Sequence, residues 1–477
     1  MKRIFAISLL ICLALIGQAQ DELGIAGSTR CPVNTLWNNP STIVDSRAFI
    51  DFNLAGVNVF AKNNFVYIPS NYMKNRNFEE MKLPGFNRGA SPYRVYSNVM
   101  IHGPSVTFAI KQHAFGISTA VRTAIDVRGV PKELGYYMTE GFQYREQMGV
   151  QQKVKNLRAN VLSWAEAGFT YGTIVSRSGD MITQAAVTVK KLWGIGGVGM
   201  RIDDWTYIVR DSSNLETIKF SGEYGFNDPV TGGFKWRNGS GMGMDLGITF
   251  KQRKKQSDEY VPYDPCTDGD YRYRFGFSIL DIGRIKFKSP YFRNIFDENE
   301  QNQWNDFSNT QVEDLAGIDS LLTAGLGAAQ KNADGIPFIM RLPTAFSAQI
   351  DYNLGYNFYI YGTITAGVPW KNRLGVQRAS YLGIAPRFET KRFELSVPIS
   401  LYEFRQPQMG MMVRLNSIII GSDDLLAILR KRDVYGADVY ISIKYTMFRH
   451  WKCEKKKSRK APKVKRQQFA PVPCPSW

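Results

Sequence analysis

The sequence predicts an all-β chain that closes into a transmembrane antiparallel β-barrel of about 14 strands (14–16), with one short helical insertion. Three observations predict this fold. Apolar and polar residues alternate along many stretches of the chain, the longest of these stretches reach about 9–11 residues, and aromatic residues gather at their ends. The chain has 477 residues, of which 44% are hydrophobic and 13% aromatic, so it is too apolar to be disordered.

Residues 1–19 have the three parts of a secretory signal peptide. Two basic residues come first, an apolar run over residues 4–16 follows, and Gly17 and Ala19 supply small residues before a cleavage site. An N-terminal membrane anchor is the alternative, but the run is short against the ~20 residues that a membrane helix needs. We therefore expect cleavage after Ala19 and export of the mature chain.

Strict alternation marks the strands. Between residues 392 and 401 every second side chain is apolar, and the residues between them are mostly polar. Successive side chains of a strand point to opposite faces, so each such stretch has one apolar and one polar face. Short connections, such as 389–391, make neighbouring strands antiparallel. The clearest stretches are 115–127, 242–250, 346–354, 392–401 and 438–447.

The polar faces decide between a barrel and a soluble sandwich. In a sandwich the apolar faces of two sheets bury each other, whereas in an outer-membrane barrel the apolar face meets lipid and the polar face lines the interior. Charged residues on the polar faces favour the barrel, and a lipid-facing barrel in an exported chain indicates the bacterial outer membrane. A secreted β-sandwich or propeller is the alternative. The candidate lumen-lining residues are Asp351, Arg392, Glu394, Arg414 and Lys444.

One segment interrupts the alternation of the barrel, which spans residues 46–449. Within this insertion, residues 288–343, apolar residues recur at helical spacing over Gln311–Ala324 and predict a short amphipathic helix. We expect this helix to pack on its own barrel, with a plug, a lid or a docking site as alternatives. Hairpins counted back from the last strand, 437–448, place the insertion on the periplasmic side, where turns are usually short. Either one strand is miscounted or the insertion enters the barrel from below, and the sequence does not choose between the two.

The C-terminal tail, residues 450–477, is basic and rich in proline. It carries nine Lys and Arg residues and one Glu, a net charge of +8, and we expect it to be extended in the periplasm. Its expected partners are anionic lipid head groups, wall polymers or an acidic periplasmic or secretion-system protein, and a solvated tail without a partner is the alternative. No nucleic acid is expected for an exported chain. The candidate partner-binding residues are Lys455, Lys456, Lys457, Arg459 and Lys460.

Four cysteines remain after the signal peptide: Cys31, Cys266, Cys453 and Cys474. Export permits disulfides, and four cysteines allow three pairings, between which the sequence does not choose. Cys453 with Cys474 is a candidate pair that would close a loop in the tail. No C-x-x-C spacing occurs, which argues against a zinc ribbon.

The sequence lacks the residue patterns of an enzyme. The three histidines, His102, His113 and His450, lie far apart without metal-ligand spacing, and no nucleophile elbow or catalytic Cys/His set is present. Gly194-x-Gly196-x-x-Gly199 matches a dinucleotide fingerprint only by letter, because no helix pattern follows it. We therefore expect no catalytic residue, no cofactor, no metal site and no enzymatic activity.

Five short motifs carry a family resemblance: Asn38–Asn39–Pro40–Ser41, Gly241–Met242–Gly243–Met244–Asp245–Leu246–Gly247, Leu342–Pro343, Pro386–Arg387–Phe388 and Gly421–Ser422–Asp423–Asp424–Leu425. Over roughly residues 25–450 the chain resembles an uncharacterised outer-membrane barrel family of Bacteroidota, a domain of unknown function. More loosely, the Asn-Pro element before a barrel is similar to the long-chain fatty-acid transporter group, which includes barrel components of the type IX secretion system. In that group an N-terminal segment enters the lumen, so the resemblance implies that residues 20–45 form a hatch. Ser41, where the group commonly has Ala, and the basic tail depart from it.

These features together predict a monomeric protein of the bacterial outer membrane that passes a small or amphiphilic solute through a gated lumen. Its barrel is expected to contact outer-membrane lipid. Two other functions stay open. One is a scaffold or secretion-system accessory that does not transport, and the other is a secreted soluble β-sandwich protein.

Overall fold

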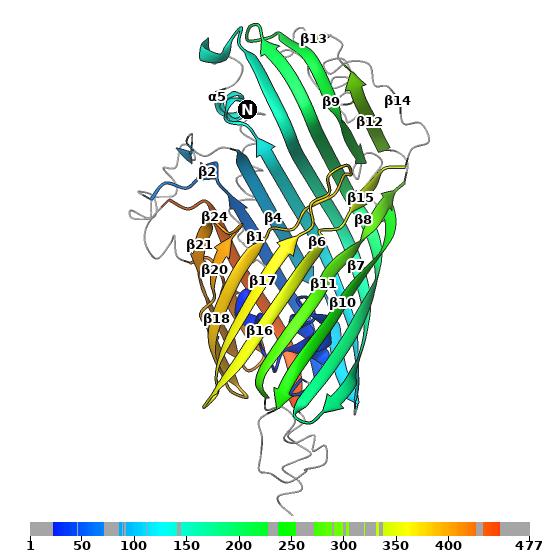
Figure 1. Ribbon diagram of the computed structural model, residues 1–477, viewed down its shortest axis with the longest axis vertical. Coiled ribbons are helices and arrows are strands. Elements are labelled where there is room, and N and C mark those ends of the chain that lie inside the picture. The colour runs from blue at the N-terminus through cyan, green and yellow to red at the C-terminus, as the bar shows by residue number, and fades with distance from the viewer. Residues whose placement is uncertain are drawn as a thin grey trace, which may run out of the picture.

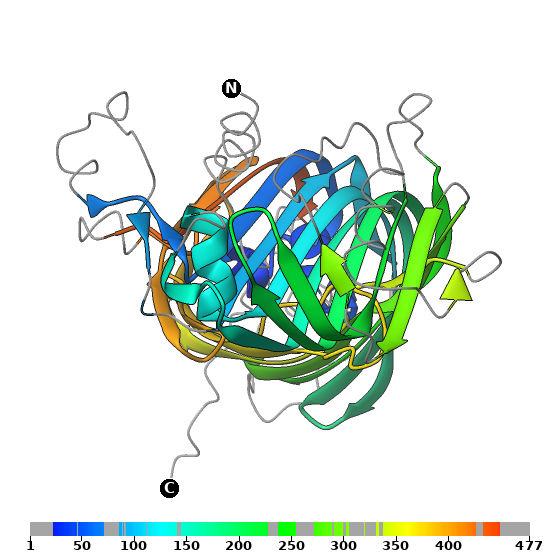
Figure 2. The same cartoon turned by 90° about the horizontal axis from the view of Figure 1, so that it is seen from above.

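The strands form one closed barrel around a short helical segment. The computed structural model describes residues 22–448 except 45, 71–84, 88, 90–91, 111, 141–144, 228–236, 254–270, 289–290, 299–301, 305–318, 320–330, 333–336 and 426–432. Figure 1 shows the barrel from the side, with the blue N-terminal segment inside its lower half, and Figure 2 shows the ring of strands from above. No helix among the described residues is long and apolar enough to cross a membrane.

The described helices are short: α2 (Leu23–Ala26), α3 (Pro32–Thr35), η1 (Pro40–Ile43), α5 (Lys132–Glu140) and η3 (Arg145–Gln147). The first half of the chain forms strands β1 (Ala48–Asn63), β2 (Val66–Tyr67), β3 (Gly85–Phe86), β4 (Tyr93–His102), β5 (Ser105–Ile110), β6 (His113–Val130), β7 (Gln151–Ser178), β8 (Met181–Val209) and β9 (Leu215–Asn227). The middle forms β10 (Gly239–Arg253), β11 (Tyr271–Phe287), β12 (Tyr291–Glu298), β13 (Asn302–Trp304), β14 (Lys331–Asn332), β15 (Ile339–Arg341), β16 (Ala345–Gly355) and β17 (Phe358–Gly367). The last part forms β18 (Tyr381–Glu389), β19 (Phe393–Ser396), β20 (Ile399–Tyr402), β21 (Gln406–Met409), β22 (Met411–Leu415), β23 (Ile418–Ser422) and β24 (Gly436–Phe448).

Pairing between the last and the first strand closes the sheet. β24 runs antiparallel to β1, from Ala48 opposite Phe448 to Lys62 opposite Gly436. Collinear pieces, such as β4 with β5 and β19 with β20, share one position in the ring. The ring therefore has 14 strands, which confirms the predicted all-β antiparallel barrel.

In the barrel wall, polar side chains are buried and apolar side chains are exposed, which is the reverse of the arrangement in a soluble protein. On β1 the polar residues Asp51 and Asn53 are buried, whereas Phe52 and Leu54 are 37% and 55% exposed. Each polar face thus looks inward and each apolar face looks out of the barrel. The alternative of a two-sheet sandwich is wrong, because the apolar faces do not pack on a second sheet.

The two longest strands, β7 and β8, extend the wall beyond the closed ring. The lower part of β8 pairs with β10 and its upper part pairs with β9. β12 and β13 pair in turn with β9, so this sheet stands above the barrel in Figure 1. An apolar cluster lines it, with Tyr207, Phe220 and Phe296 among its buried members.

The insertion 288–343 begins at the upper end of the barrel, opposite the end where β24 finishes. Of the two alternatives, a miscounted strand is therefore the correct one, because the insertion does not begin on the side of the C-terminal tail. The additional reversal lies within residues 411–422, where the chain turns back at Asn416 and Ser417 so that β22 pairs with β23 as a hairpin. Asn416 has a φ of 50°, a left-handed conformation that asparagine tolerates in tight turns. The predicted helix Gln311–Ala324 lies almost entirely outside the described residues.

Candidate functional site: the lumen and its N-terminal segment

Residues 22–47, called the hatch segment below, occupy the lower lumen. The segment consists of α2, α3 and η1 joined by short turns, and nearly all of its described side chains are buried. Both views place it inside the ring of strands (Figures 1 and 2). The structure therefore puts the segment where the resemblance implied a hatch.

Carboxylates on the wall bind backbone N–H groups of the hatch segment. Asp423 accepts hydrogen bonds from Leu23 (2.7 Å) and Gly24 (3.3 Å) at the start of α2. Glu389 accepts one from Thr29 at 3.3 Å, and Asp51 accepts one from Val33 at 3.1 Å in the first turn of α3. The first N–H groups of a helix have no partner inside the helix. Buried wall carboxylates supply the missing acceptors.

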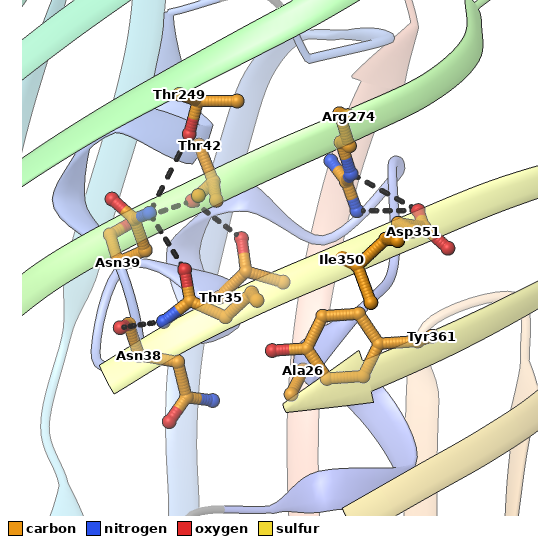
Figure 3. Close-up of a pocket in the computed structure, with 12 residues that line it drawn as sticks. Ala26, Thr35, Asn38, Asn39, Thr42, Thr249, Arg274, Ile350, Asp351 and Tyr361 are labelled. Carbon is orange, nitrogen blue, oxygen red and sulfur yellow. Dashed lines mark hydrogen bonds and ion pairs between the residues drawn. The ribbon is translucent and has the colours of Figure 1, made fainter. Parts of the chain in front are cut away.

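The Asn-Pro element fixes the far end of the segment. Asn39 caps η1, because its side chain accepts the N–H of Ser41 at 3.0 Å. Its Nδ2 atom donates to Gln349 at 2.9 Å and to the hydroxyl of Thr249 at 3.4 Å (Figure 3). The hydroxyl of Ser41 lies 2.7 Å from that of Thr249. A Cβ atom at Gly247 would meet the Asn39 side chain and come within 2.9 Å of Pro40. The glycine lets the segment approach the wall.

Four of the five candidate lumen-lining residues lie buried inside the barrel with oppositely charged partners. Asp351 lies 3.0 Å from Arg387, Glu394 lies 3.0 Å from Arg414, and Lys444 lies 2.7 Å from Asp51. Arg274 binds Asp351 from another strand, as Figure 3 shows.

The fifth candidate, Arg392, is misassigned. It is exposed in the turn between β18 and β19, where the chain reverses and the alternation of the following strand has not begun. Cys31, by contrast, is fully buried beside Met412 and Tyr440, and burial raises the pKa of its thiol.

A second set of charges lies above the hatch segment and was not named as a site from the sequence. Asp281 binds Arg122 through two hydrogen bonds of 2.8 and 2.9 Å, Lys190 at 2.8 Å and Arg378 at 3.4 Å. Lys190 also lies 2.7 Å from Asp245. We call these residues, with Glu166, the central charge cluster: Arg122, Glu166, Lys190, Asp245, Asp281 and Arg378. For the five members on strands, alternation with apolar neighbours was the available signal, whereas Arg378 lies in the connection 368–380.

An apolar layer closes the lumen above this cluster. The connection 368–380 folds inward and binds the last residue of β15. The N–H of Arg341 donates to the carbonyl of Leu374 (3.1 Å), and the carbonyl of Arg341 accepts from the N–H of Val376 (3.3 Å). The upper apolar layer consists mainly of Phe287, Phe338, Met340, Leu342, Leu374 and Val376, all buried. A pocket between the hatch segment and the central charge cluster has a volume of about 20 Å³, room for about one water molecule.

The other predicted sites lie outside the described residues. They are the signal peptide 1–19, the tail 450–477 with Lys455, Lys456, Lys457, Arg459 and Lys460, and the candidate pair Cys453 and Cys474. Within the described part of the chain, no group of His, Cys, Asp and Glu side chains is arranged to hold a metal ion.

Solved structures similar to this chain include two toluene transporters and a FadL homologue. TbuX of Ralstonia pickettii is 9% identical, with 91% of this chain and 98% of that chain covered and a TM-score of 0.39. TodX of Pseudomonas putida is 9% identical, with 88% and 93% covered and a TM-score of 0.37. A FadL homologue of Pseudomonas aeruginosa is 9% identical, with 88% and 96% covered and a TM-score of 0.29.

No curated protein matches the chain. A family model does match it over residues 40–423, and that family is described as a family of unknown function, DUF5723. The match covers most of the barrel together with η1 and the central charge cluster, and it agrees with the resemblance found in the sequence. The chain belongs to the DUF5723 family.

Proposed function

We propose that the protein is a gated channel of the bacterial outer membrane, without enzymatic activity, that passes a small or amphiphilic solute. The hatch segment is the gate in this proposal. The observation that carries it is that a segment of the chain fills the lower lumen and is held there by hydrogen bonds to the wall.

The outer surface supports the membrane location. Apolar side chains are exposed around the ring, among them Ile117 on β6, Phe277 on β11 and Ile443 on β24. Exposed Tyr352 and Tyr445 lie toward the lower rim, as expected of an interfacial aromatic girdle. Soluble monomers rarely expose apolar patches of more than several hundred Å², and contact with lipid accounts for such a surface.

The contacts of the hatch segment support gating. Each hydrogen bond between the segment and the wall contributes only about 1 kcal/mol net, because water replaces the partner when the contact breaks. The strands of the barrel pair with one another independently of the segment. Displacement of the segment therefore costs far less than opening the wall.

The lining of the lumen supports a solute with both polar and apolar parts. The upper apolar layer comes first from above, and the central charge cluster follows. That cluster opposes Arg122, Lys190 and Arg378 to three carboxylates, so its formal charge is balanced. Such a path does not favour a solute with a net positive or a net negative charge.

Liposome swelling tests the proposal. Proteoliposomes that hold the mature protein are compared with those that hold a variant without residues 20–45, in a sugar and in an amphiphile of similar size. The variant should swell faster in at least one of the two solutes. A lock, S41C/T249C in a background without the other cysteines, should swell slowest when it is oxidised, because the two parent hydroxyl oxygens lie only 2.7 Å apart. Equal swelling of all three proteins contradicts the proposal.

One observation favours a second candidate, a scaffold that does not transport. Within the part of the chain that the structure describes, the hatch segment and the upper apolar layer occupy the lumen at two levels, and a pocket between the segment and the central charge cluster is only about 20 Å³. A scaffold predicts no swelling even without the hatch segment, and a co-purifying partner that is lost when residues 450–477 are removed.

A further inference from the structure

We propose that the outer surface of the barrel binds a phosphorylated lipid at a site formed by β8, β10, β11 and β15. The phosphates contact four basic side chains, which we call the basic row: Lys191, Arg284, Lys286 and Arg341. The acyl chains lie in an apolar groove below the row. This site is separate from the lumen and does not depend on what the channel carries.

Strand register brings the basic row together on the outer face. Met242 of β10 lies opposite both Lys191 of β8 and Arg284 of β11. Arg284 lies opposite Arg341 of β15. Residues directly opposite each other in antiparallel strands share one face, and their chain neighbours on β8, β11 and β15 are fully buried on the inner face. Those neighbours are Leu192, Ile285 and Met340.

The charges of the row have no carboxylate partner among the described residues. Lys191 donates to the hydroxyl of Ser240 at 2.9 Å, and the guanidinium of Arg341 lies 4.8 Å from the ring centre of Trp370. Like charges directly opposite each other, as in Arg284 and Arg341, destabilise a sheet. A polyanion with several acceptor oxygens removes this repulsion and gains charge-assisted hydrogen bonds.

The row lies at the upper edge of the apolar band. Along β11, 11 residues separate Arg284 from Tyr273, which pairs with Tyr352 toward the lower rim. At about 3.3 Å per residue and a tilt of about 40°, this separation is roughly 28 Å in height. The apolar band of an outer-membrane barrel is about 25 Å tall. The basic row therefore sits at the level of lipid head groups.

An apolar groove of about 630 Å³ opens on the same face below the row. Large side chains such as Phe277 and Phe346 border it, and the small residues Ala185, Ala348 and Ala366 leave space between them. Leu246, another lining residue, is four residues from Met242 on β10, or about 13 Å along the strand. An acyl chain that descends from a head group at the row reaches this groove.

The position of the basic row indicates which leaflet of the membrane supplies the lipid. It lies toward the end of the barrel that carries the tall β7–β8–β9 sheet and the insertion, away from the end where β24 finishes. In bacterial barrels the longer connections face outward. The ligand is thus an acylated lipid of the outer leaflet. It carries phosphates, because their negative charge complements the positive charge of the basic row.

Native mass spectrometry of the full chain in a neutral detergent tests the site. The probe is lipid A, an acylated glucosamine disaccharide with two phosphates. The variant K191Q/R284Q/K286Q should bind it about tenfold more weakly, or weaker still, since each basic side chain near an anionic surface adds to affinity. The matched variant K155Q/K391Q/R392Q removes three exposed basic residues elsewhere and should bind as the wild type does. Both variants should keep heat-modifiable gel mobility.

Three further arms separate the possible outcomes. Lipid A without phosphates should bind the wild type as weakly as lipid A binds the row variant. Ala348→Phe, which fills the groove, should weaken binding of lipid A and leave the row intact. Inorganic phosphate at the lipid's concentration should not displace lipid A. Equal binding by the row variant and the matched variant, equal binding of phosphate-free lipid, or displacement by inorganic phosphate would each overturn the proposal.

Discussion

The carboxylate of Asp423 accepts a hydrogen bond from the backbone N–H of Leu23 at 2.7 Å, although the two residues are 400 positions apart in the sequence. The N–H of Gly24 and the hydroxyl of Tyr440 also donate to this carboxylate, at 3.3 and 3.1 Å. The contact attaches the first helix of the hatch segment to the wall just beyond β23. A single substitution at Asp423 is therefore expected to change how tightly the hatch segment is held in the lumen.

Asp423→Ala should loosen the hatch segment. The change leaves the buried N–H of Leu23 without its acceptor, at a cost of about 1–3 kcal/mol. Cys31 belongs to this segment and is buried against Met412 and Tyr440, so the rate at which maleimide labels its thiol reports displacement of the segment. In a background without the other cysteines, labelling should be slow in the wild type and faster in the variant. Below about pH 6, where the wild-type carboxyl is protonated, Asp423→Asn, which keeps one acceptor oxygen, should fall between them, and equal rates in all three would contradict the contact.

The same carboxyl predicts a pH response. Burial raises the pKa of Asp423 to about 7, and the negative charge of Glu22 adds to this effect, while hydrogen bonds from Leu23, Gly24 and Tyr440 oppose it. Because the pKa is raised when the hatch segment is in place, protonation of Asp423 stabilises the contact between the segment and the wall. This stabilisation is fully present when the pH is below the ordinary pKa of 3.8. This stabilisation is lost as pH rises through about 7.

Cys31 labelling, divided at each pH by that of a small free thiol, should therefore increase from about pH 6 to about pH 8. Asp423→Asn should abolish the increase, because the amide does not titrate. If labelling of the wild type does not change with pH, a group other than Asp423 controls how tightly the hatch segment is held.

Gly247→Ala should displace the Asn-Pro element without changing any charge. The added Cβ would overlap the Asn39 side chain and crowd Pro40, and such overpacking costs about 1–3 kcal/mol. Labelling of Cys31 should rise while heat-modifiable mobility is retained. Gly116→Ala serves as the control, since its Cβ would come no closer than 3.3 Å to a neighbouring atom. Faster labelling in the control would mean that the assay reports general destabilisation.

Asp281→Ala should destabilise the barrel itself. It removes the shared partner of Arg122, Lys190 and Arg378 and leaves buried cations facing one another. Breaking a buried ion pair from one side typically costs about 3–5 kcal/mol. The temperature at which the heat-modifiable band disappears should fall clearly. Glu403→Ala, which removes a partner of Arg94 and Arg128 nearer the surface, should have a smaller effect, and the reverse order would count against the cluster as a structural centre.

Alternation predicted the wall of the barrel because each residue of a strand faces either lipid or lumen. It therefore assigned Asp351 and Lys444 to the inside, where they are buried. It did not show the hairpin at Asn416, because apolar residues continue on both sides of the turn. Without that reversal, hairpins counted back from the last strand lead to the opposite end of the barrel, which is why the sequence left the side of the insertion open.

The central charge cluster was not predictable from spacing. Asp281 is 159 positions from Arg122 and 91 from Lys190, and alternation gives the face of each strand without the strand that lies across the lumen. The basic row was missed for the same reason, since strand register, which the sequence alone does not determine, aligns Lys191 with Arg284. The place of the hatch segment came from the resemblance and not from its residues.

Single-channel conductance of the S41C/T249C lock tests the gate most directly. In a planar bilayer the oxidised protein should stay closed, and reduction of the disulfide should produce opening events that resemble those of the wild type. A variant without residues 20–45 should conduct more often than either. Conductance that is the same before and after reduction, or absent from all three proteins, would contradict a lumen gated by its N-terminal segment.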